Sequence, residues 1–291
     1  MNQSTELMES PVSRKEIASW AMFDFANSSY VTVVSTAVFN AYFVGTVAKS
    51  LGTGTATLYL TSLIAISNLL VVVSAPIIGA MADYTARKKF LLLITSIALV
   101  LSVVLLGFVG PGDIWFGLVV LGLANLMFGT GEDLIAAFLP EIADQNNMGR
   151  ISALGWAVGY IGGLGVLAIC LSYIKWAESL GQVSSQFVPV TMWIVALVFA
   201  LGATPTFLFL KERAKPHPTP RQESYFSIGF GRLKETVKRR AEFRDLFVFL
   251  LSLLAFTSGS TTVAVMAAVY AEQVMGFETS DTILMIMVVN V

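Results

Sequence analysis

The chain has 291 residues, of which 56% are hydrophobic and 13% are charged, and its mean hydropathy is +0.76. Ordinary soluble domains carry about 25% charged residues, so a water-soluble fold would leave large apolar patches exposed. The formal net charge of −1 argues against a nucleic-acid-binding protein, which usually has a broad basic surface. The composition therefore predicts a protein whose main solvent is the lipid bilayer.

Apolar stretches long enough to cross a bilayer recur along the chain. A transmembrane helix needs about 20 apolar residues. We expect seven spans, over residues 17–47, 58–82, 90–109, 114–139, 151–176, 187–210 and 243–271. An eighth apolar stretch begins near Thr282 and is too short to cross before the chain stops at Val291. We expect an all-α polytopic membrane protein that is truncated within a helix and is part of a longer protein.

Basic residues lie almost entirely in alternate connections between these spans. Of the 18 Lys and Arg residues, all except Lys49 and Lys175 fall in the N-terminal tail, the turn at 83–89, Arg150 and the segment 211–244. The positive-inside rule places these parts in the cytoplasm. The polar, acidic N-terminus is unlike a signal peptide. We expect a multi-pass protein of a bacterial-type inner membrane or its equivalent, with the N-terminus cytoplasmic.

These features divide the chain into four parts. We expect a cytoplasmic N-terminal tail over 1–16, a six-helix bundle over 17–210, a cytoplasmic linker over 211–242 and the beginning of a second bundle over 243–291. Two bundles with a solute site between them form a common transporter plan.

The linker differs in composition from the rest of the chain. Prolines at 216, 218 and 220 oppose helix formation in its first half, whereas 231–244 is expected to form a basic amphipathic helix along anionic headgroups. The only histidine, His217, lies among these prolines, where a solvated loop residue is the simpler interpretation than a proton relay. One histidine and one cysteine, Cys170, favour neither a metal site nor a disulfide. We expect no metal and no cofactor.

Three acidic residues interrupt the spans. Asp24 lies in the first span, with Asn27 on the same helical face and Tyr30 nearby, and Glu132 and Asp133 are adjacent in the fourth. A charge at the centre of a span costs at least about 2.5–3.5 kcal/mol, so it needs a partner, a watery cavity or a function. One hypothesis is that these acids bind a coupling proton or a cationic substrate group. The alternative is that they cap helix ends and contact headgroup water.

The segment GAMADYTARKK follows the second span. Gly79 permits close approach of another helix, and Asp83 and Arg87, four residues apart, can pair with each other or clamp a neighbouring helix end. Taken alone, an acidic residue followed by basic ones is equally typical of a cytoplasmic stop signal.

Two further patterns concern the fifth and seventh spans. Gly155, Gly159 and Gly163 form a stripe of small residues that favours close helix packing, beside which Trp156 and Tyr160 are candidates to line a cavity.

In the seventh span, the sequence TSGSTT at 257–262, which includes Ser258, interrupts the apolar residues. It indicates either an unwound, solute-facing segment or hydroxyls bonded to their own helix.

These segments resemble known transporters. GAMADYTARKK resembles the cytoplasmic loop motif of the major facilitator superfamily, in which a glycine, an aspartate four residues later and an arginine four further are followed by a basic residue. SWAMFDFANSSY, AAFLPEIAD and GWAVGYIGGLG are similar to stretches of its vacuole-effluxer-like branch, which is related to the yeast vacuolar amino-acid exporter.

The resemblance implies a twelve-helix transporter that alternates between inward-open and outward-open states. It places Asp24, Asn27, Glu132 and 257–262 near the solute path, and Asp83 and Arg87 in a cytoplasmic latch. Two departures concern substrate and coupling: Thr257-Ser258-Gly259 stands where relatives often carry an acidic or amide pair, and Gly131-Glu132-Asp133 is more acidic than usual.

The function expected is secondary transport of a small polar solute by alternating access, with amino acids as candidate substrates and protons as the coupling ion. The partners expected are the lipid bilayer and a small-molecule substrate. A polytopic sensor or scaffold is the alternative. An intramembrane enzyme is disfavoured because the chain has no HExxH or GxSxG motif, and ATP-driven pumping because it has no GxxxxGK[ST] loop.

Overall fold

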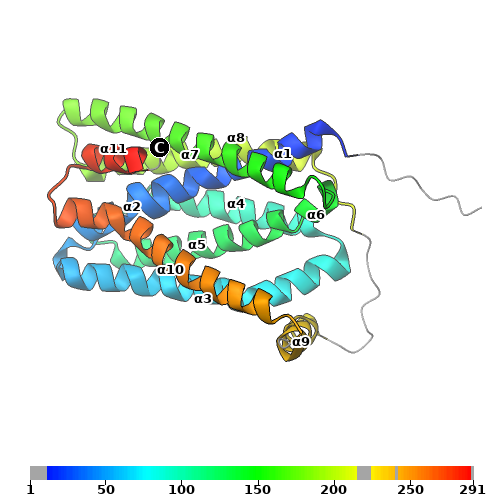
Figure 1. Ribbon diagram of the computed structural model, residues 1–291. Helices are drawn as coiled ribbons and strands as arrows, with labels where there is room; N and C mark the ends of the chain where they lie inside the picture. Colours follow the sequence, from blue (N-terminus) through cyan, green and yellow to red (C-terminus); the bar gives the residue numbers. More distant parts are fainter. Residues whose placement is uncertain (1–11, 215–223, 240–241, 290–291) are drawn as a thin grey trace, which may run out of the picture.

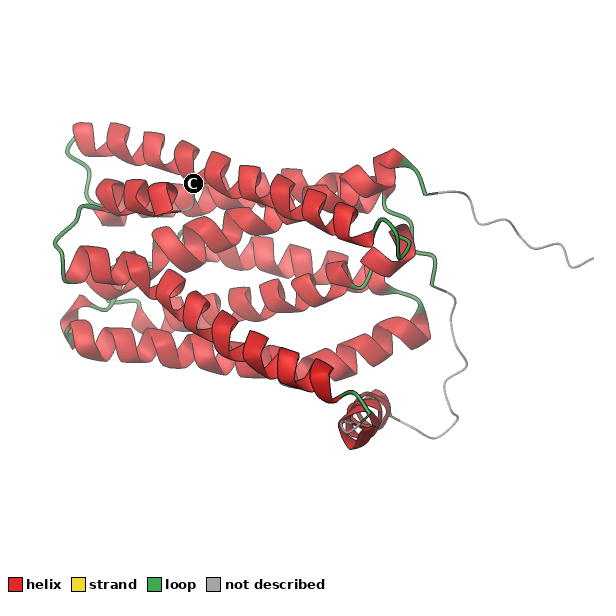
Figure 2. Ribbon diagram, viewed as in Figure 1, coloured by secondary structure: helices red, strands yellow, loops and turns green. Residues whose placement is uncertain are grey.

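The computed structural model describes residues 12–214, 224–239 and 242–289. These residues form helices and connecting loops with no strand among them, which confirms the predicted all-α class (Figure 2). Most of the N-terminal tail, and His217 with its neighbouring prolines, lie outside the described residues. Within the described part, seven helical segments are long and apolar enough to cross a membrane, so the predicted number of spans is confirmed.

The elements follow one another across the bundle (Figure 1). They are α1 (Arg14–Tyr30), the π-helical η1 (Val31–Ala37), α2 (Phe39–Tyr42), the π-helical η2 (Phe43–Val47), the 3-10 turn η3 (Lys49–Leu51), α3 (Thr53–Thr85), α4 (Lys88–Leu106), α5 (Ile114–Ala136), α6 (Leu139–Ile142), α7 (Met148–Ser179), α8 (Ser184–Phe209), α9 (Tyr225–Lys238), α10 (Arg244–Gln273) and α11 (Thr279–Val289). The first span runs from α1 through η2, and the fourth comprises α5 and α6.

The second half of the first span departs from regular α geometry. The backbone N–H of Val38 bonds to the Val33 carbonyl, and that of Ala48 to the Phe43 carbonyl, both at 2.8 Å and both five residues back. Consecutive β-branched residues at 31–34 lower the preference for regular α-helix here. Single π-helical turns within α-helices are frequent at functional sites.

α1 is the central helix of the bundle and packs along α7 and α8. Its Trp20 donates an indole hydrogen bond to the Ile135 carbonyl of α5 at 3.0 Å. Phe23 lies edge-on to Phe199 and Phe207 of α8, with ring centroids 6.0 and 6.3 Å apart. By contrast, the apolar side chains of α3 are largely exposed, as a lipid-facing span requires.

α10 is packed at only one of its ends. Between 244 and 263 every residue is exposed except the half-buried Phe247, whereas Ala268, Val269 and Ala271 are buried. The buried part of α10 contacts η1, α2 and η2, and α11 contacts α7. We call the end of the bundle that carries α6 and α9 the linker end (Figure 1). α10 therefore packs at the opposite end and separates from the other spans toward the linker end.

The amphipathic helix of the linker lies earlier than the sequence pattern predicts. It is α9, Tyr225–Lys238, rather than 231–244. The Ser224 side chain caps its N-terminus by accepting a hydrogen bond from the Ser227 N–H at 3.2 Å, and α10 begins at Arg244. Such a cap fixes the start of a helix more strongly than the charge pattern does.

Candidate functional site

A cavity of about 230 Å³ lies between α1, η1, α5 and α7. Its walls combine acidic, amide and aromatic side chains: Asp24 and Asn27 of α1, Phe128 and Glu132 of α5, and Trp156 and Tyr160 of α7. Among the described residues that line this cavity, none is basic. Most of the substrate and coupling residues expected from the sequence therefore lie together.

The glycine stripe of α7 brings α1 against this cavity. A Cβ at Gly155 would collide with the Asp24 carboxylate and the Trp20 ring. A Cβ at Gly159 would lie 2.9 Å from the Ser28 hydroxyl and 3.2 Å from the Asp24 carbonyl oxygen. The stripe packs α7 onto α1, as small residues do between membrane helices. Trp156 and Tyr160, which lie beside the stripe, line the cavity. The segment therefore both packs against α1 and contributes side chains to the cavity wall.

Amide and carboxyl groups connect α1 to α5 across the cavity. The Asn27 side chain is buried and donates a hydrogen bond to Glu132 Oε1. One turn deeper, the fully buried Tyr30 donates from its hydroxyl to Asn125 Oδ1 at 2.7 Å and stacks on Phe128 with centroids 5.2 Å apart. Tyr30 therefore does not line the cavity, and instead contacts Asn125 and the cavity-lining Phe128.

Trp156 and Tyr160 form one aromatic wall of the cavity. Their rings stack with centroids 5.6 Å apart and an interplanar angle of 23°. Trp156 lines the cavity and is 74% exposed, although it lies in a span. Stacked rings beside carboxylates offer a surface that attracts cations.

The two adjacent acids of α5 face different ways. Glu132 lines the cavity, whereas Asp133 lines a smaller hollow of about 60 Å³ together with Gly79, Asp83 and Lys88 at the linker end. Successive helical residues are separated by about 100°. Glu132 and Asp133 therefore line separate hollows on different sides of α5.

Ser258 lies apart from this cavity. It lines a groove of about 410 Å³ between α3 and α10, with Thr61 and Asn68 on the facing helix. α10 continues as helix through 257–262, and the hydroxyls of Thr257 and Thr262 donate to the carbonyls of Leu253 and Ser258, both at 2.7 Å. The helix is therefore not unwound here, although its hydroxyl face is turned to a groove.

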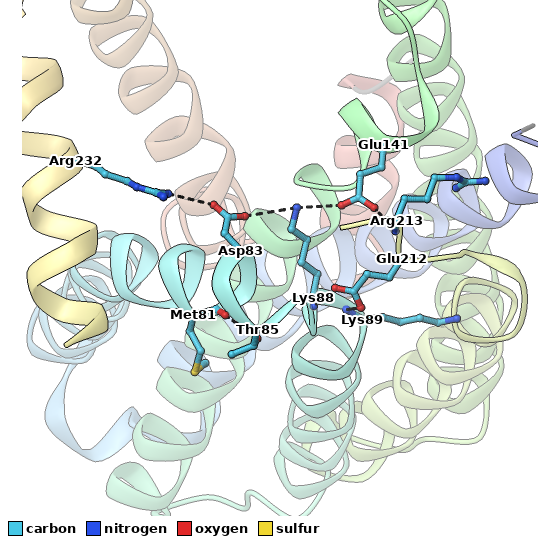
Figure 3. Close-up of polar contacts among 9 residues, drawn as sticks. All are labelled: Met81, Asp83, Thr85, Lys88, Lys89, Glu141, Glu212, Arg213 and Arg232. Carbon is cyan, nitrogen blue, oxygen red and sulfur yellow. Dashed lines mark hydrogen bonds and ion pairs between the residues drawn. The ribbon is translucent and has the colours of Figure 1, made fainter. Parts of the chain in front are cut away.

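Asp83, at the end of α3, pairs with two basic residues (Figure 3). Asp83 forms ion pairs with Lys88, at 3.6 Å, and with Arg232 of α9, at 3.5 Å. Of the two arrangements left open by the sequence, Asp83 contacts a neighbouring helix, α9, and does not pair with Arg87, because α3 ends at Thr85 and the left-handed Ala86 (φ 49°) reverses the chain. No atom lies within 4 Å of a Cβ at Gly79, so no close helix contact requires that glycine in this conformation.

The same cluster continues to the start of the linker (Figure 3). Lys88 contacts Glu141 of α6 at 3.0 Å, and Glu141 accepts the Arg213 backbone N–H at 2.8 Å. The Arg213 guanidinium pairs with Glu16 of α1 at 3.0 Å, and both side chains are largely buried. These contacts join the ends of α1, α4 and α6 to the linker.

Sequence reasoning did not identify Phe128, Glu141 or Arg213. Phe128 precedes Glu132 by four residues and so shares its helical face, a spacing that would have indicated a cavity position. No comparable signal links Glu16, Glu141 and Arg213, because their contacts join segments far apart in the chain.

Similarity to known proteins extends over most of the chain. The family model described as "Vacuole effluxer Atg22 like" matches residues 12–291. The chain is 29% identical over 282 residues to a protein of Bacillus subtilis (strain 168) described as "Uncharacterized MFS-type transporter YxiO". That alignment covers 95% of this chain but 64% of the relative, so the chain spans less than two thirds of the relative's length. No solved structure matches the chain significantly.

Proposed function

This chain belongs to the vacuole effluxer Atg22-like family, and from that membership and the geometry of the cavity we propose that it forms part of a facilitator-type secondary transporter. The transporter would move a small polar solute that carries an amino group, with amino acids as the first class to test, by alternating access. Movement of the solute would be coupled to protons. Membership of a transporter-like family favours this function over a sensor, a scaffold or an enzyme.

The observation that carries the proposal is the acidic cavity between α1, α5 and α7. Asp24 and Glu132 lie in the apolar stretches 17–47 and 114–139, which contain no basic residue, and no basic side chain lines the cavity among the residues described. An ionised carboxyl group within a membrane span has an unfavourable free energy unless it binds a cation or a proton. An ammonium group can pair with them and lie against the Trp156 and Tyr160 rings, whereas a proton can neutralise them once the solute has left.

In the proposed alternating-access transporter, α10 would be the first helix of the second bundle. α10 is buried against the first span at the opposite end and exposed toward the linker end. Under the positive-inside rule we place the linker end in the cytoplasm. In the proposed transporter, movement of the second bundle relative to the first would open and close the space beside α10 at this end.

The test is a counterflow assay in proteoliposomes that contain the transporter of which this chain forms part, with radiolabelled lysine, leucine and glutamate as cationic, neutral and anionic probes. For Asp24→Asn and Glu132→Gln we expect at least about tenfold slower counterflow of whichever amine probe the wild type exchanges, because a charged hydrogen bond contributes about 1.5–3 kcal/mol. The matched control is Asp144→Asn, which removes an exposed carboxylate in the α6–α7 turn and should leave exchange unchanged.

Coupling is tested in the same vesicles with a pH-sensitive dye. Solute-dependent proton movement is expected in the wild type and should disappear in at least one of the two cavity variants. Solute exchange and proton movement at wild-type rates in both variants would contradict a role for these carboxyl groups in substrate or proton binding. Saturable exchange of glutamate in preference to lysine and leucine would overturn the substrate class.

A further inference from the structure

α9 carries an apolar stripe that no described part of the chain covers. Phe226, Phe230, Leu233 and Val237 follow one another at spacings of four, three and four residues, which is one face of a helix. The side chains of Phe226, Leu233 and Val237 are 57%, 49% and 42% exposed. The rings of Phe226 and Phe230 contact each other with centroids 4.6 Å apart, so the stripe is continuous along the helix.

A different face of α9 fixes the helix to α3. Ile228 and Gly229 are buried, and a Cβ at Gly229 would collide with the Pro76 carbonyl group. Arg232 reaches Asp83 at 3.5 Å and lies over the Tyr84 ring, 5.3 Å from its centroid. These contacts set the rotation of α9, so the apolar stripe is held in one direction.

α9 lies at the depth of a membrane surface. Figure 1 shows the helix nearly end-on where the spans run across the view, so its axis is close to the plane of the bilayer. Its contact with Pro76 lies about two and a half turns before the end of α3 at Thr85. The helix is therefore beside the last turns of a span and not beyond them, as an interfacial helix requires.

Two positive charges beside the stripe have no partner in the part of the chain that the structure describes. Arg232 is paired with Asp83, and Arg239 with Glu242 at 2.6 Å. Lys234 and Lys238 are exposed and border a shallow groove together with Phe230, Leu233 and Val237. The groove therefore joins an apolar floor to two ammonium groups.

We propose that this groove binds an anionic glycerophospholipid of the leaflet at the linker end. The acyl chains would cover the stripe of Phe226, Phe230, Leu233 and Val237, and the phosphate would accept hydrogen bonds from Lys234 and Lys238. Because Arg232 of the same helix holds Asp83, bound lipid would also hold α9 against the turn between α3 and α4. The inference concerns a lipid site outside the acidic cavity and does not depend on transport.

The test is hydrogen exchange of segment 225–239 in nanodiscs of phosphatidylcholine alone or mixed with phosphatidylglycerol. Phosphatidylglycerol should slow exchange, by about fivefold for each lysine engaged, since each basic residue near an anionic surface contributes about 1 kcal/mol. Changing Lys234→Gln and Lys238→Gln together should abolish that protection without shifting the melting temperature. The control, Lys49→Gln with Lys175→Gln, removes two charges elsewhere and should retain it.

Each of the following outcomes would contradict the proposed lipid site. Equal exchange in both lipid mixtures would mean that the stripe is covered by protein or left bare. Protection that persists in the double lysine variant would place the lipid elsewhere. Protection produced by inorganic phosphate in phosphatidylcholine nanodiscs would show a soluble anion site. Changing Leu233→Ser and Val237→Ser should separately weaken protection in phosphatidylglycerol, and unchanged protection there would remove the acyl-chain contact.

Discussion

Asn27 of α1 donates its side-chain amide hydrogen bond to the carboxylate of Glu132 in α5, more than a hundred residues later in the chain. The bond joins two spans across the acidic cavity, and Asn27 is buried. An amide that bonds an acid within a membrane both orients the carboxyl and links the helices that carry it.

A double-mutant cycle measures this link. Asn27→Ala combined with Glu132→Gln should show a coupling free energy of about 1.5–3 kcal/mol in the unfolding of the protein, because hydrogen bonds to charged groups lie in that range. Thermal unfolding in nanodiscs is the measurement. Asn27→Ala combined with Asp133→Asn should be additive, because Asp133 lines a separate hollow; equal coupling in both cycles would contradict the pairing.

The packing of α7 on α1 predicts a sharp difference between two glycines of the same helix. Gly159→Ala should destabilise the protein by about 1–3 kcal/mol, because the new methyl group meets Ser28 and the Asp24 backbone. Gly165→Ala should be neutral or stabilising by up to about 1 kcal/mol, because nothing lies within 4 Å and alanine favours helix. The melting temperature should fall in Gly159→Ala and should stay the same or rise in Gly165→Ala. A similar fall in both variants would argue against the close approach of α7 to α1.

The ion pair between Glu16 and Arg213 should matter far more than the surface pair between Arg239 and Glu242. Arg213→Met leaves the Glu16 carboxylate buried and unpaired, which should cost about 3–5 kcal/mol. Arg239→Met removes a pair whose side chains are 62% and 56% exposed, which should cost at most about 1 kcal/mol. The free energy of unfolding measures both.

A double variant that leaves no buried charge at this site provides the control for this comparison. Glu16→Gln added to Arg213→Met should recover part of the lost stability, because no charge is then left buried. If Arg213→Met costs no more than Arg239→Met, the buried contact does not hold the linker to α1.

Span number and helical class follow from the sequence because the bilayer demands a fixed length of apolar helix, whatever the tertiary contacts are. The cavity was partly predictable for the same reason: Asp24 and Glu132 stand out as charges in apolar sequence, and Asn27 shares a face with Asp24. The pairing of Asp83 was not predictable. Its partners depend on a left-handed turn at Ala86 and on the docking of α9, and neither leaves a periodic signal.

The charges at the linker end lead to a prediction about α9. Asp83→Asn removes both partners of this carboxylate, Lys88 and Arg232, so the amides of α9 should exchange hydrogen about threefold to tenfold faster, as expected for the loss of about 1 kcal/mol. Arg87→Ala should leave that exchange unchanged, since Asp83 is paired elsewhere. Faster exchange in Arg87→Ala and not in Asp83→Asn would contradict the pairs of Asp83 with Lys88 and Arg232.

The orientation of the bundle rests on the distribution of basic residues, and the structure gives two positions that can report it. Ser50 lies in the exposed connection after the first span, and Asn146 in the exposed turn between α6 and α7 at the linker end. Cys170 is the only cysteine and is buried, so Cys170→Ala supplies a thiol-free background. In intact cells, a membrane-impermeant maleimide should label Ser50→Cys and spare Asn146→Cys, because positive-inside topology places the linker end in the cytoplasm. After permeabilisation both should label. Labelling of Asn146→Cys alone in intact cells would invert the bundle and place the proposed lipid site of α9 on the outer leaflet.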